Sequence, residues 1–339
     1  MKRLSSLLVV ATCGLMVLST RAADARRDFL KLIERPRVDL APKVEEPSTT
    51  NGLKLYHFSF AADARQRVPG FLLKSADSQG RRPVIIALHG TGGSKTDMLR
   101  LCRQFVARGF IAVAIDGRYH GERSPLGKGS AEYEAAILRA WHEPGEHSFF
   151  YDTVWDVMRL VDYLETRDDV DAKRIGLTGI SKGGIETYLA AAMDERIAVA
   201  VPCIGVQSFH WALDNDAWQG RIGTIPNVFK AIATESGASN AAVVQKFYDR
   251  VAPGIYGEFD GPAMLPLIAP RPLLVINSDS DNHTPLPGVN ECIKTARRTY
   301  HNAGADAQLA VRIQEHAGHQ VKPESEREAI EWFVKWLKP

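Results

Sequence analysis

Residues 174–184 read RIGLTGISKGG, and this stretch decides the fold of the chain. The apolar run over 175–178 predicts a buried strand, and the apolar residues after Gly184 predict a helix. Between them lies Gly179-Ile180-Ser181-Lys182-Gly183, with a glycine two positions on either side of the serine. A strand that turns sharply into a helix needs small residues there, and the turn strains the serine backbone. We therefore predict that Ser181 is a nucleophile at the end of a strand.

Short apolar runs on both sides of this stretch predict further buried strands, over 84–88, 110–115, 198–201, 273–276 and 309–313. Runs that are apolar on both faces are typical of parallel sheets covered by helices. The periodicity of 152–166 and 323–337 predicts two such helices. Alternation over 53–60 and an apolar run over 68–73 predict an antiparallel hairpin at a sheet edge. We expect an α/β fold: a mostly parallel central sheet of about eight strands with helices on both faces.

One segment, residues 207–268, is too long for a simple connection between two parallel strands. It is rich in aromatic residues, including Trp211 and Trp218. It follows the sixth predicted strand, so it would stand above the carboxyl ends of the sheet, where α/β proteins bind ligands. We predict a helical insertion that serves as a lid. The alternative is that its aromatic residues only attach extra helices to the core.

The N-terminal residues have the composition of an export signal. Lys2 and Arg3 precede an apolar stretch over 7–18, and small residues follow near Ala22. This order predicts a signal peptide over 1–22, then a lead-in over 23–50 and the main domain over 51–339. The expected location is therefore secreted or periplasmic. No later stretch is long and apolar enough to span a membrane.

Bulk composition excludes some classes of partner. The 42 basic and 40 acidic residues give a net charge of +2, with no long run of one sign. This balance gives no reason to expect a nucleic-acid partner. After removal of the signal peptide, Cys102, Cys203 and Cys292 remain, an odd number that implies no disulfide framework. We expect Cys102 and Cys203 to be buried thiols, because both lie in apolar segments.

A glycine-rich loop, Leu88-His89-Gly90-Thr91-Gly92-Gly93, directly follows the strand over 84–88. Glycines here let the backbone approach a ligand, so we predict an oxyanion hole from the N–H groups of Thr91 and Lys182. Gly92 is an alternative donor to Thr91. A phosphate-binding loop is disfavoured because the glycine spacing and the ending of known phosphate loops are absent. Because Lys182 would act through its N–H, Lys182→Ala should lower the rate far less than Ser181→Ala.

The acidic partner is expected after the strand over 273–276, where Asp279 and Asp281 are both candidates. We favour Asp281, which lies farther into the loop and just before a proline-fixed turn, and we assign Asp279 to a turn or cap. A metal site formed by Asp279, Asp281 and His283 is the weaker alternative. We predict no metal and no cofactor.

The base is expected after the last strand, where the chain reads His316-Ala317-Gly318-His319. We choose His319, since it opens the loop into the final helix, and regard His316 as structural. The order Ser181, Asp281, His319 is the order in which this fold carries its triad. The two histidines have zinc-like spacing, but no helical motif with a flanking glutamate accompanies them.

Four further residues are candidates for contact with the substrate: His120, Glu122, Trp141 and Trp211. The first two follow the strand over 110–115, and Trp211 lies in the predicted insertion. Glu122 has a structural alternative, a salt bridge to Arg118 or Arg123.

Several motifs resemble the dienelactone-hydrolase-like and acetyl-xylan-esterase-like branch of the α/β hydrolases, which borders the prolyl oligopeptidase catalytic domain. They are the loop over 88–93, Asp116 to Glu122, Gly179 to Gly184, Ala269 to Leu274 and Gly318-His319. The resemblance implies a serine hydrolase and hardly restricts its substrate. Dienelactone hydrolases use cysteine where this chain has Ser181. The residues before Pro83 are too few for the propeller of a prolyl oligopeptidase.

Together these features predict an exported hydrolase of carboxylic esters that acts through an acyl-enzyme. The expected partner is a small-molecule ester or an acylated carbohydrate. The alternatives are a peptidase or amidase of small peptides, a non-catalytic binding protein of the same fold, and a metal-dependent hydrolase built on Asp279, Asp281, His316 and His319.

Overall fold

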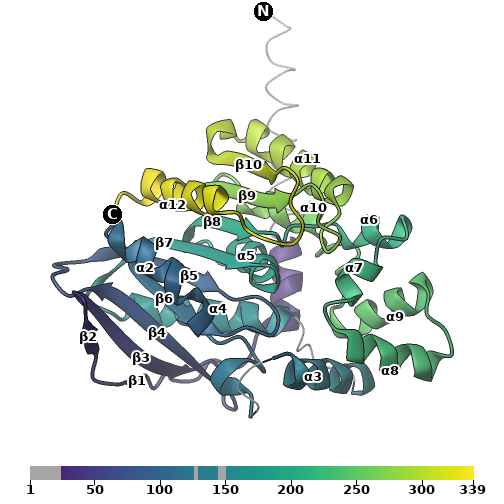
Figure 1. The fold of residues 1–339 in the computed structure, drawn as a ribbon, viewed down its shortest axis with the longest axis horizontal. Helices are drawn as coiled ribbons and strands as arrows, with labels where there is room; N and C mark the ends of the chain where they lie inside the picture. The colour runs from purple at the N-terminus through teal and green to yellow at the C-terminus, as the bar shows by residue number, and fades with distance from the viewer. Residues whose placement is uncertain (1–23, 126–128, 144–149) are drawn as a thin grey trace, which may run out of the picture.

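A central β-sheet with helices on both faces forms the protein (Figure 1). The computed structural model describes residues 24–125, 129–143 and 150–339. The predicted α/β class is confirmed, with a sheet of ten strands rather than about eight. The two additional strands, β1 (Lys43–Val44) and β2 (Ser48–Thr50), are too short to leave a periodic signal in the sequence.

The remaining strands are β3 (Leu53–Ala61), β4 (Arg67–Ser75), β5 (Arg82–Leu88), β6 (Ile111–Ile115), β7 (Val170–Ile180), β8 (Ile197–Cys203), β9 (Leu273–Ser278) and β10 (Leu309–Gln314). The α-helices are one over residues 24–33, α2 (Leu99–Ala107), α3 (Ala131–His142), α4 (Tyr151–Glu165), α5 (Lys182–Met193), α6 (Phe209–Asp214), α7 (Gln219–Ile222), α8 (Pro226–Ser236), α9 (Ala241–Val251), α10 (Gly261–Met264), α11 (Leu286–Asn302) and α12 (Pro323–Leu337).

The order of strands across the sheet is β1-β3-β4-β6-β5-β7-β8-β9-β10, with β2 beside β3. From β6 through β10 all neighbours are parallel, whereas β3 and β4 form the predicted antiparallel hairpin. Because parallel strands end at one edge, the loops after β5, β7, β9 and β10 meet there. These loops carry all of the residues that we predicted for catalysis.

Alternate side chains of the central strands bury two separate cores. Val84 and Ile86 of β5 face the helices α4 and α5, whereas Ile85 and Ala87 face α2 and α12. This alternation follows from the two-residue period of a strand. A strand buried on both faces therefore reads as a continuous apolar run, which is the pattern that revealed the sheet in the sequence.

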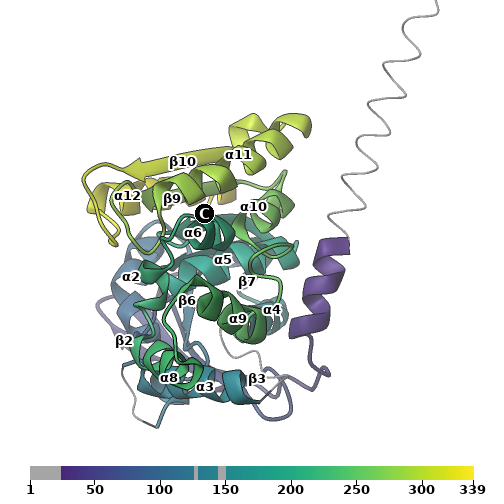
Figure 2. The same cartoon turned by 90° about the vertical axis from the view of Figure 1, so that its right-hand side faces the viewer.

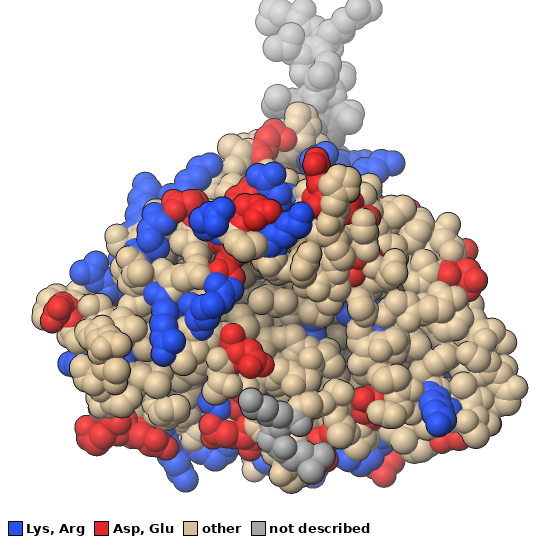
Figure 3. Space-filling model, in the orientation of Figure 1, with Lys and Arg blue, Asp and Glu red and all other residues tan. Residues whose placement is uncertain are grey.

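The five helices α6 to α10 lie between β8 and β9, and we call residues 207–268 the insertion. Its helices α8 and α9 pack against α3, at the right of Figure 1. Aromatic contacts order the insertion and attach it: within it Phe209 lies 5.5 Å from Tyr248, and Phe247 lies 6.4 Å from Trp141 of α3, between ring centroids. Figure 3 shows the surface hollowed between the sheet and the insertion, with Lys or Arg atoms visible in its depth.

The helix over residues 24–33 lies at the side of the domain (Figure 2) and buries Phe29 and Ile33 completely. Phe29 packs edge-on against Tyr151, at 4.7 Å between ring centroids. The predicted signal peptide lies outside the described residues. Among the described helices, none has the length and hydropathy of a membrane span. Cys102, Cys203 and Cys292 are buried free thiols, as expected for the first two.

Candidate active site

Ser181 lies at the turn between β7 and α5 with a strained backbone, at φ 58° and ψ −114°. A residue with a side chain rarely adopts a positive φ, so the neighbouring packing must impose it. A Cβ at Gly183 would overlap the carbonyl oxygens of Leu88 and His89, which explains the second glycine of the motif. The backbone N–H of Ser181 donates to the Cys203 carbonyl at 2.9 Å. The turn is thus fixed from both neighbouring strands.

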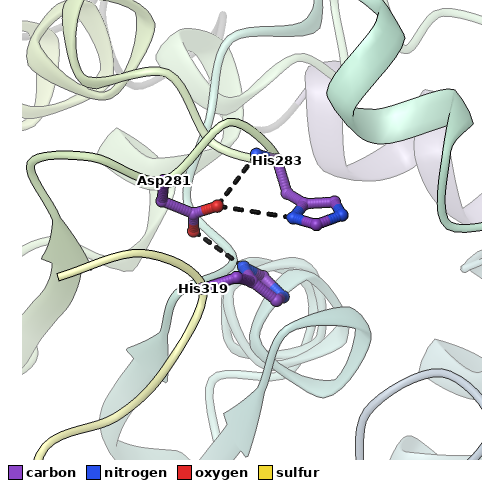
Figure 4. A group of neighbouring side chains, drawn as sticks. All are labelled: Asp281, His283 and His319. Carbon is purple, nitrogen blue, oxygen red and sulfur yellow. Dashed lines mark hydrogen bonds and ion pairs between the residues drawn. The ribbon is translucent and has the colours of Figure 1, made fainter.

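The structure brings Ser181, His319 and Asp281 into one hydrogen-bonded row. His319 Nε2 lies 2.7 Å from Ser181 Oγ. On the other side of the ring, His319 Nδ1 lies 2.7 Å from Asp281 Oδ2, a contact shown in Figure 4. Ser181 is 9% exposed and Asp281 is 3% exposed. In this arrangement the imidazole can take the hydroxyl proton while the carboxylate orients the ring.

Three neighbours stabilise the ionised form of Asp281. Burial alone would raise the pKa of this carboxyl, but hydrogen bonds from His283, His319 and Thr284 hold the pKa well below its usual range. Thr284 Oγ1 donates to Oδ2 at 2.7 Å, and the backbone N–H of His283 donates to Oδ1 at 2.8 Å. Asp281 is therefore a carboxylate at every pH at which an ester would be assayed.

The side chain of Asp279, the alternative acid, contacts the backbone of the loop that carries the two histidines. Its carboxylate accepts from the N–H groups of His316 at 2.8 Å and of Ala317 at 3.1 Å. It thereby ties the loop after β9 to the loop after β10. His316 contributes its backbone to this contact, so neither residue replaces Asp281 or His319 in the hydrogen-bonded row.

His283 is a residue beside the row to which the sequence assigned no catalytic role. Its ring lies 4.4 Å from the ring of His319 between centroids, and its Nδ1 lies 3.5 Å from Asp281 Oδ1. Asp281, His283 and His319 place potential metal-ligand atoms within 4.8 Å of one another (Figure 4). The hydrogen bonds within this group account for the short separations. Among the described residues, Asp279 and His316 do not belong to this group.

The glycine-rich loop after β5 lies directly against Ser181. Gly93 N–H donates to the Gly90 carbonyl at 3.2 Å, and Gly92 has a φ of 74°, which closes a tight turn. A Cβ on Gly90 would lie 3.6 Å from the Ser181 Cβ. Within the described chain, the N–H groups of Thr91, Gly92 and Lys182 donate to no other residue. All three are therefore unpaired within the described chain, and Thr91 and Lys182 remain our predicted donors.

His89 holds this loop in place, a role that we did not assign from the sequence. Its Nδ1–H donates to the Gly90 carbonyl at 2.8 Å, and its Nε2 accepts from the Gly117 N–H at 3.0 Å. These two neutral partners require the neutral ring. Burial, with the nearby charge of Lys182, lowers the pKa of His89 to about 3. The only hint in the sequence is its place between the strand and Gly90.

The side chain of Lys182 is buried and forms an ion pair with Glu186, at 2.7 Å between Nζ and Oε1. Burial raises the pKa of Glu186, and the Lys182 charge opposes that shift. The Lys182 side chain therefore has a buried structural contact of its own, apart from the backbone N–H that we predict as an oxyanion donor.

His120 and Glu122 make their contacts away from the hydrogen-bonded row. His120 is fully buried, donates from Nδ1 to the Arg118 carbonyl at 2.8 Å and lies 5.0 Å from the His89 ring. Glu122 pairs with Lys95 at 2.5 Å, whereas Arg118 and Arg123 pair with Asp156. Glu122 therefore forms a salt bridge, as the structural alternative predicted, but its partner is Lys95 and not Arg118 or Arg123.

Trp141 and Trp211 also make their contacts away from the row. Trp141 Nε1 donates to Glu235 at 2.9 Å, and Arg250 lies 5.5 Å from the centre of its ring. It lines a surface cavity of about 500 Å³ with residues of α9. Trp211, on α6, lies over Gly288 at the start of α11, where an added Cβ would lie 3.4 Å from its ring. Within the described residues, neither tryptophan makes a ring contact or hydrogen bond with Ser181, Asp281 or His319.

The sheet topology and the serine at its strand-to-helix turn define a serine-dependent hydrolase of the α/β-hydrolase fold. The chain belongs to the acetyl xylan esterase (AXE1) family, whose sequence profile matches residues 29–238. The resemblance seen in the sequence motifs is thereby confirmed for the acetyl-xylan-esterase-like branch.

Comparison with known proteins gives relatives and structures of the same kind. YtaP of Bacillus subtilis is 26% identical over 288 residues, which cover 81% of this chain and 85% of YtaP. The 4-O-methyl-glucuronoyl methylesterase 1 of Sodiomyces alcalophilus is 30% identical over 199 residues, covering 58% of this chain and 36% of that protein. The acetyl xylan esterase from Paenibacillus sp. R4 superposes with a TM-score of 0.64 at 19% identity, covering 94% of this chain and 93% of its own. Methylesterase BT1017 superposes with a TM-score of 0.67 at 18% identity. The match covers 94% of this chain and 64% of the BT1017 chain. At these identities the structural likeness shows the fold alone.

Proposed function

We propose that the protein is an exported carbohydrate esterase that cleaves carboxylic esters through an acyl-enzyme on Ser181. The observation that carries this proposal is the position of His319, with one ring nitrogen at Ser181 Oγ and the other at Asp281 Oδ2, both at 2.7 Å. A serine hydroxyl becomes a strong nucleophile when a neighbouring base takes its proton.

The proposed reaction has two halves. Ser181 Oγ attacks the ester carbonyl carbon while His319 Nε2 takes the hydroxyl proton, and Asp281 stabilises the imidazolium. The carbonyl oxygen becomes an oxyanion that accepts from the N–H groups of Thr91 and Lys182. The C–O bond to the alcohol then breaks, and His319 returns the proton to the leaving oxygen. Water repeats the sequence on the acyl-enzyme, so that the acid is released and the serine is restored.

The names of the relatives support an ester of a sugar as the substrate. One relative is a 4-O-methyl-glucuronoyl methylesterase, and another is the acetyl esterase Axe7A of Xylanibacter ruminicola. We infer an acylated or esterified carbohydrate, acted on outside the cytoplasm because residues 1–22 have the pattern of a signal peptide. Small peptide amides are the less favoured substrates.

Ser181→Ala tests the proposal most directly. We expect it to lower esterase activity on acetylated sugars and aryl acetates by about 10⁴–10⁶-fold. It should also abolish labelling by a fluorophosphonate, which reacts only with an activated serine. Ser280→Ala is the matched control, because the hydroxyl of this exposed serine contacts only its sequence neighbour Asp279. Near wild-type activity in Ser181→Ala, or loss of activity on addition of a chelator, would contradict the proposal.

A further inference from the structure

Arg221, on α7 of the insertion, is a buried cation without an acidic partner. Five Lys or Arg residues of the described chain are buried as whole residues, and four of them form ion pairs: Lys95, Arg118, Arg159 and Lys182. Arg221 is 4% exposed and forms no ion pair with any described residue. A buried charge without a counter-charge is strongly unfavourable, so the fold retains one only where something compensates it.

Neutral oxygen atoms hold one side of the Arg221 guanidinium. With the Gln207 amide turned to satisfy its surroundings, its oxygen accepts from Nε at 3.1 Å and Nη2 at 3.2 Å, and its nitrogen donates to the His283 carbonyl at 2.9 Å. Nη2 also donates to that carbonyl at 3.1 Å. The side chain is therefore fixed in direction before any ligand arrives.

The third nitrogen of the guanidinium, Nη1, differs from Nε and Nη2. Nη1 makes no hydrogen bond within the described part of the chain. Nη1 is nevertheless not fully enclosed, unlike Nε of Arg159, which also has no partner. Nη1 therefore retains contact with the surface.

Arg221 lies close to the candidate triad. Its Nη2 contacts the carbonyl of His283, whose ring lies 4.4 Å from the ring of His319. Its Nε contacts Gln207. Two residues earlier in the chain, Gly205 packs against the carbonyl of Ser181. Arg221 is thus separated from His319 by a single residue, His283.

We propose that Arg221 forms an anion-binding subsite beside the triad and selects esters that carry a second, free carboxylate group. This inference rests on the proposed esterase function and names its substrate class: an ester on or next to an acidic sugar. A carboxylate would supply the missing counter-charge and accept from Nη1, and such charge-assisted hydrogen bonds are strong in a desolvated site.

A different account would make Arg221 a counter-charge for Asp281, whose carboxylate interacts with it electrostatically. The two accounts predict different kinetics. A positioning role through the acid loop would affect every ester equally, because every reaction uses Asp281. An anion subsite would affect only substrates with a free carboxylate.

Matched pairs of esters separate these accounts. The pairs are meta-carboxyphenyl acetate with phenyl acetate, and the para-nitrophenyl half-ester of glutarate with para-nitrophenyl valerate. They place the charge on the alcohol side and on the acyl side, respectively. In the wild-type protein, kcat/KM should favour the acidic member of at least one pair by about tenfold or more, the contribution of one hydrogen bond to a charged group.

Variants then assign the preference to Arg221. Arg221→Met should lower kcat/KM for the preferred acidic ester by about 10–100-fold and for the neutral ester less than threefold. Arg221→Lys, which keeps the charge, should retain part of the preference and serves if Arg221→Met does not fold. Lys230→Met, which removes an exposed cation from α8, should leave the preference unchanged. No preference in the wild type, or equal losses on both members of the pair, would overturn the proposal.

A binding measurement separates this inference from the proposed function. In the Ser181→Ala variant, glucuronate should raise the melting temperature while glucose at the same concentration should not. The further change Arg221→Met should remove that difference. This result requires no turnover, so it tests the subsite even if every ester assay fails. If glucuronate and glucose behave alike in Ser181→Ala, the subsite does not exist, whatever the esterase assays show.

Discussion

Gly220 of the insertion packs directly onto the backbone of Asn282, so closely that a Cβ at Gly220 would overlap the Asn282 carbonyl oxygen. Asn282 stands between Asp281, which contacts His319, and His283, whose ring packs on His319. The insertion therefore supports the loop that carries the acid. The insertion is therefore part of the scaffold of the candidate site.

Gly220→Ala should impair catalysis from outside the triad. The new methyl group meets backbone, which no rotamer change can avoid, so the loop carrying Asp281 must shift. A misplacement of about 1 Å can cost on the order of 10²-fold in rate, and we expect kcat to fall by at least tenfold. Gly257→Ala is the matched control in the same insertion, because a Cβ there meets no atom within 4 Å. Equal kcat values for the two variants would show that the contact is unimportant.

Lys182→Met should destabilise the protein even though the backbone N–H survives. The substitution leaves Glu186 buried without its partner, and breaking a buried ion pair costs about 3–5 kcal/mol in the free energy of unfolding. The double variant Lys182→Met/Glu186→Gln removes both charges and should recover much of that loss. Urea unfolding of the three proteins measures the effect. A double variant no more stable than the single one would contradict the assignment.

His89 should make the protein less stable in mild acid. Its pKa is about 3 when folded and 6.5 ordinarily, so between these values only the unfolded chain binds the proton. Stability then falls as the pH falls, by about 1.4 kcal/mol per pH unit for this group. His89→Gln should reduce the loss between pH 7 and pH 5 by about 2 kcal/mol. The comparison is urea unfolding at both values, with exposed His210→Gln as the control. If both variants lose stability as the wild type does, His89 is not the responsible group.

Local patterns in the sequence determined most of the architecture. A strand buried on both faces must be apolar throughout, and a sharp turn into a helix must place glycines at Gly179 and Gly183. Both requirements act on consecutive residues, so the sequence alone was enough to recognise them. The strands β1 and β2 could not, since two or three residues carry no period. The assignment of Ser181, Asp281 and His319 likewise needed only the order of the predicted strands, because each residue follows one of them.

Only the tertiary structure decided which side chains meet across loops. The sequence offered Asp279 beside Asp281 and His316 beside His319, and the packed loops show which pair exchanges a hydrogen bond. The sequence suggested the wrong salt-bridge partner for Glu122, and it gave no sign that Arg221 is buried without an acidic partner. The physical reason is that periodicity and turn chemistry act over a few residues, whereas a contact between distant loops depends on how whole elements pack. Local sequence patterns were enough to predict the sheet and its candidate nucleophile, Ser181. The packing of the insertion against the loop of Asp281 sets the surroundings of that serine.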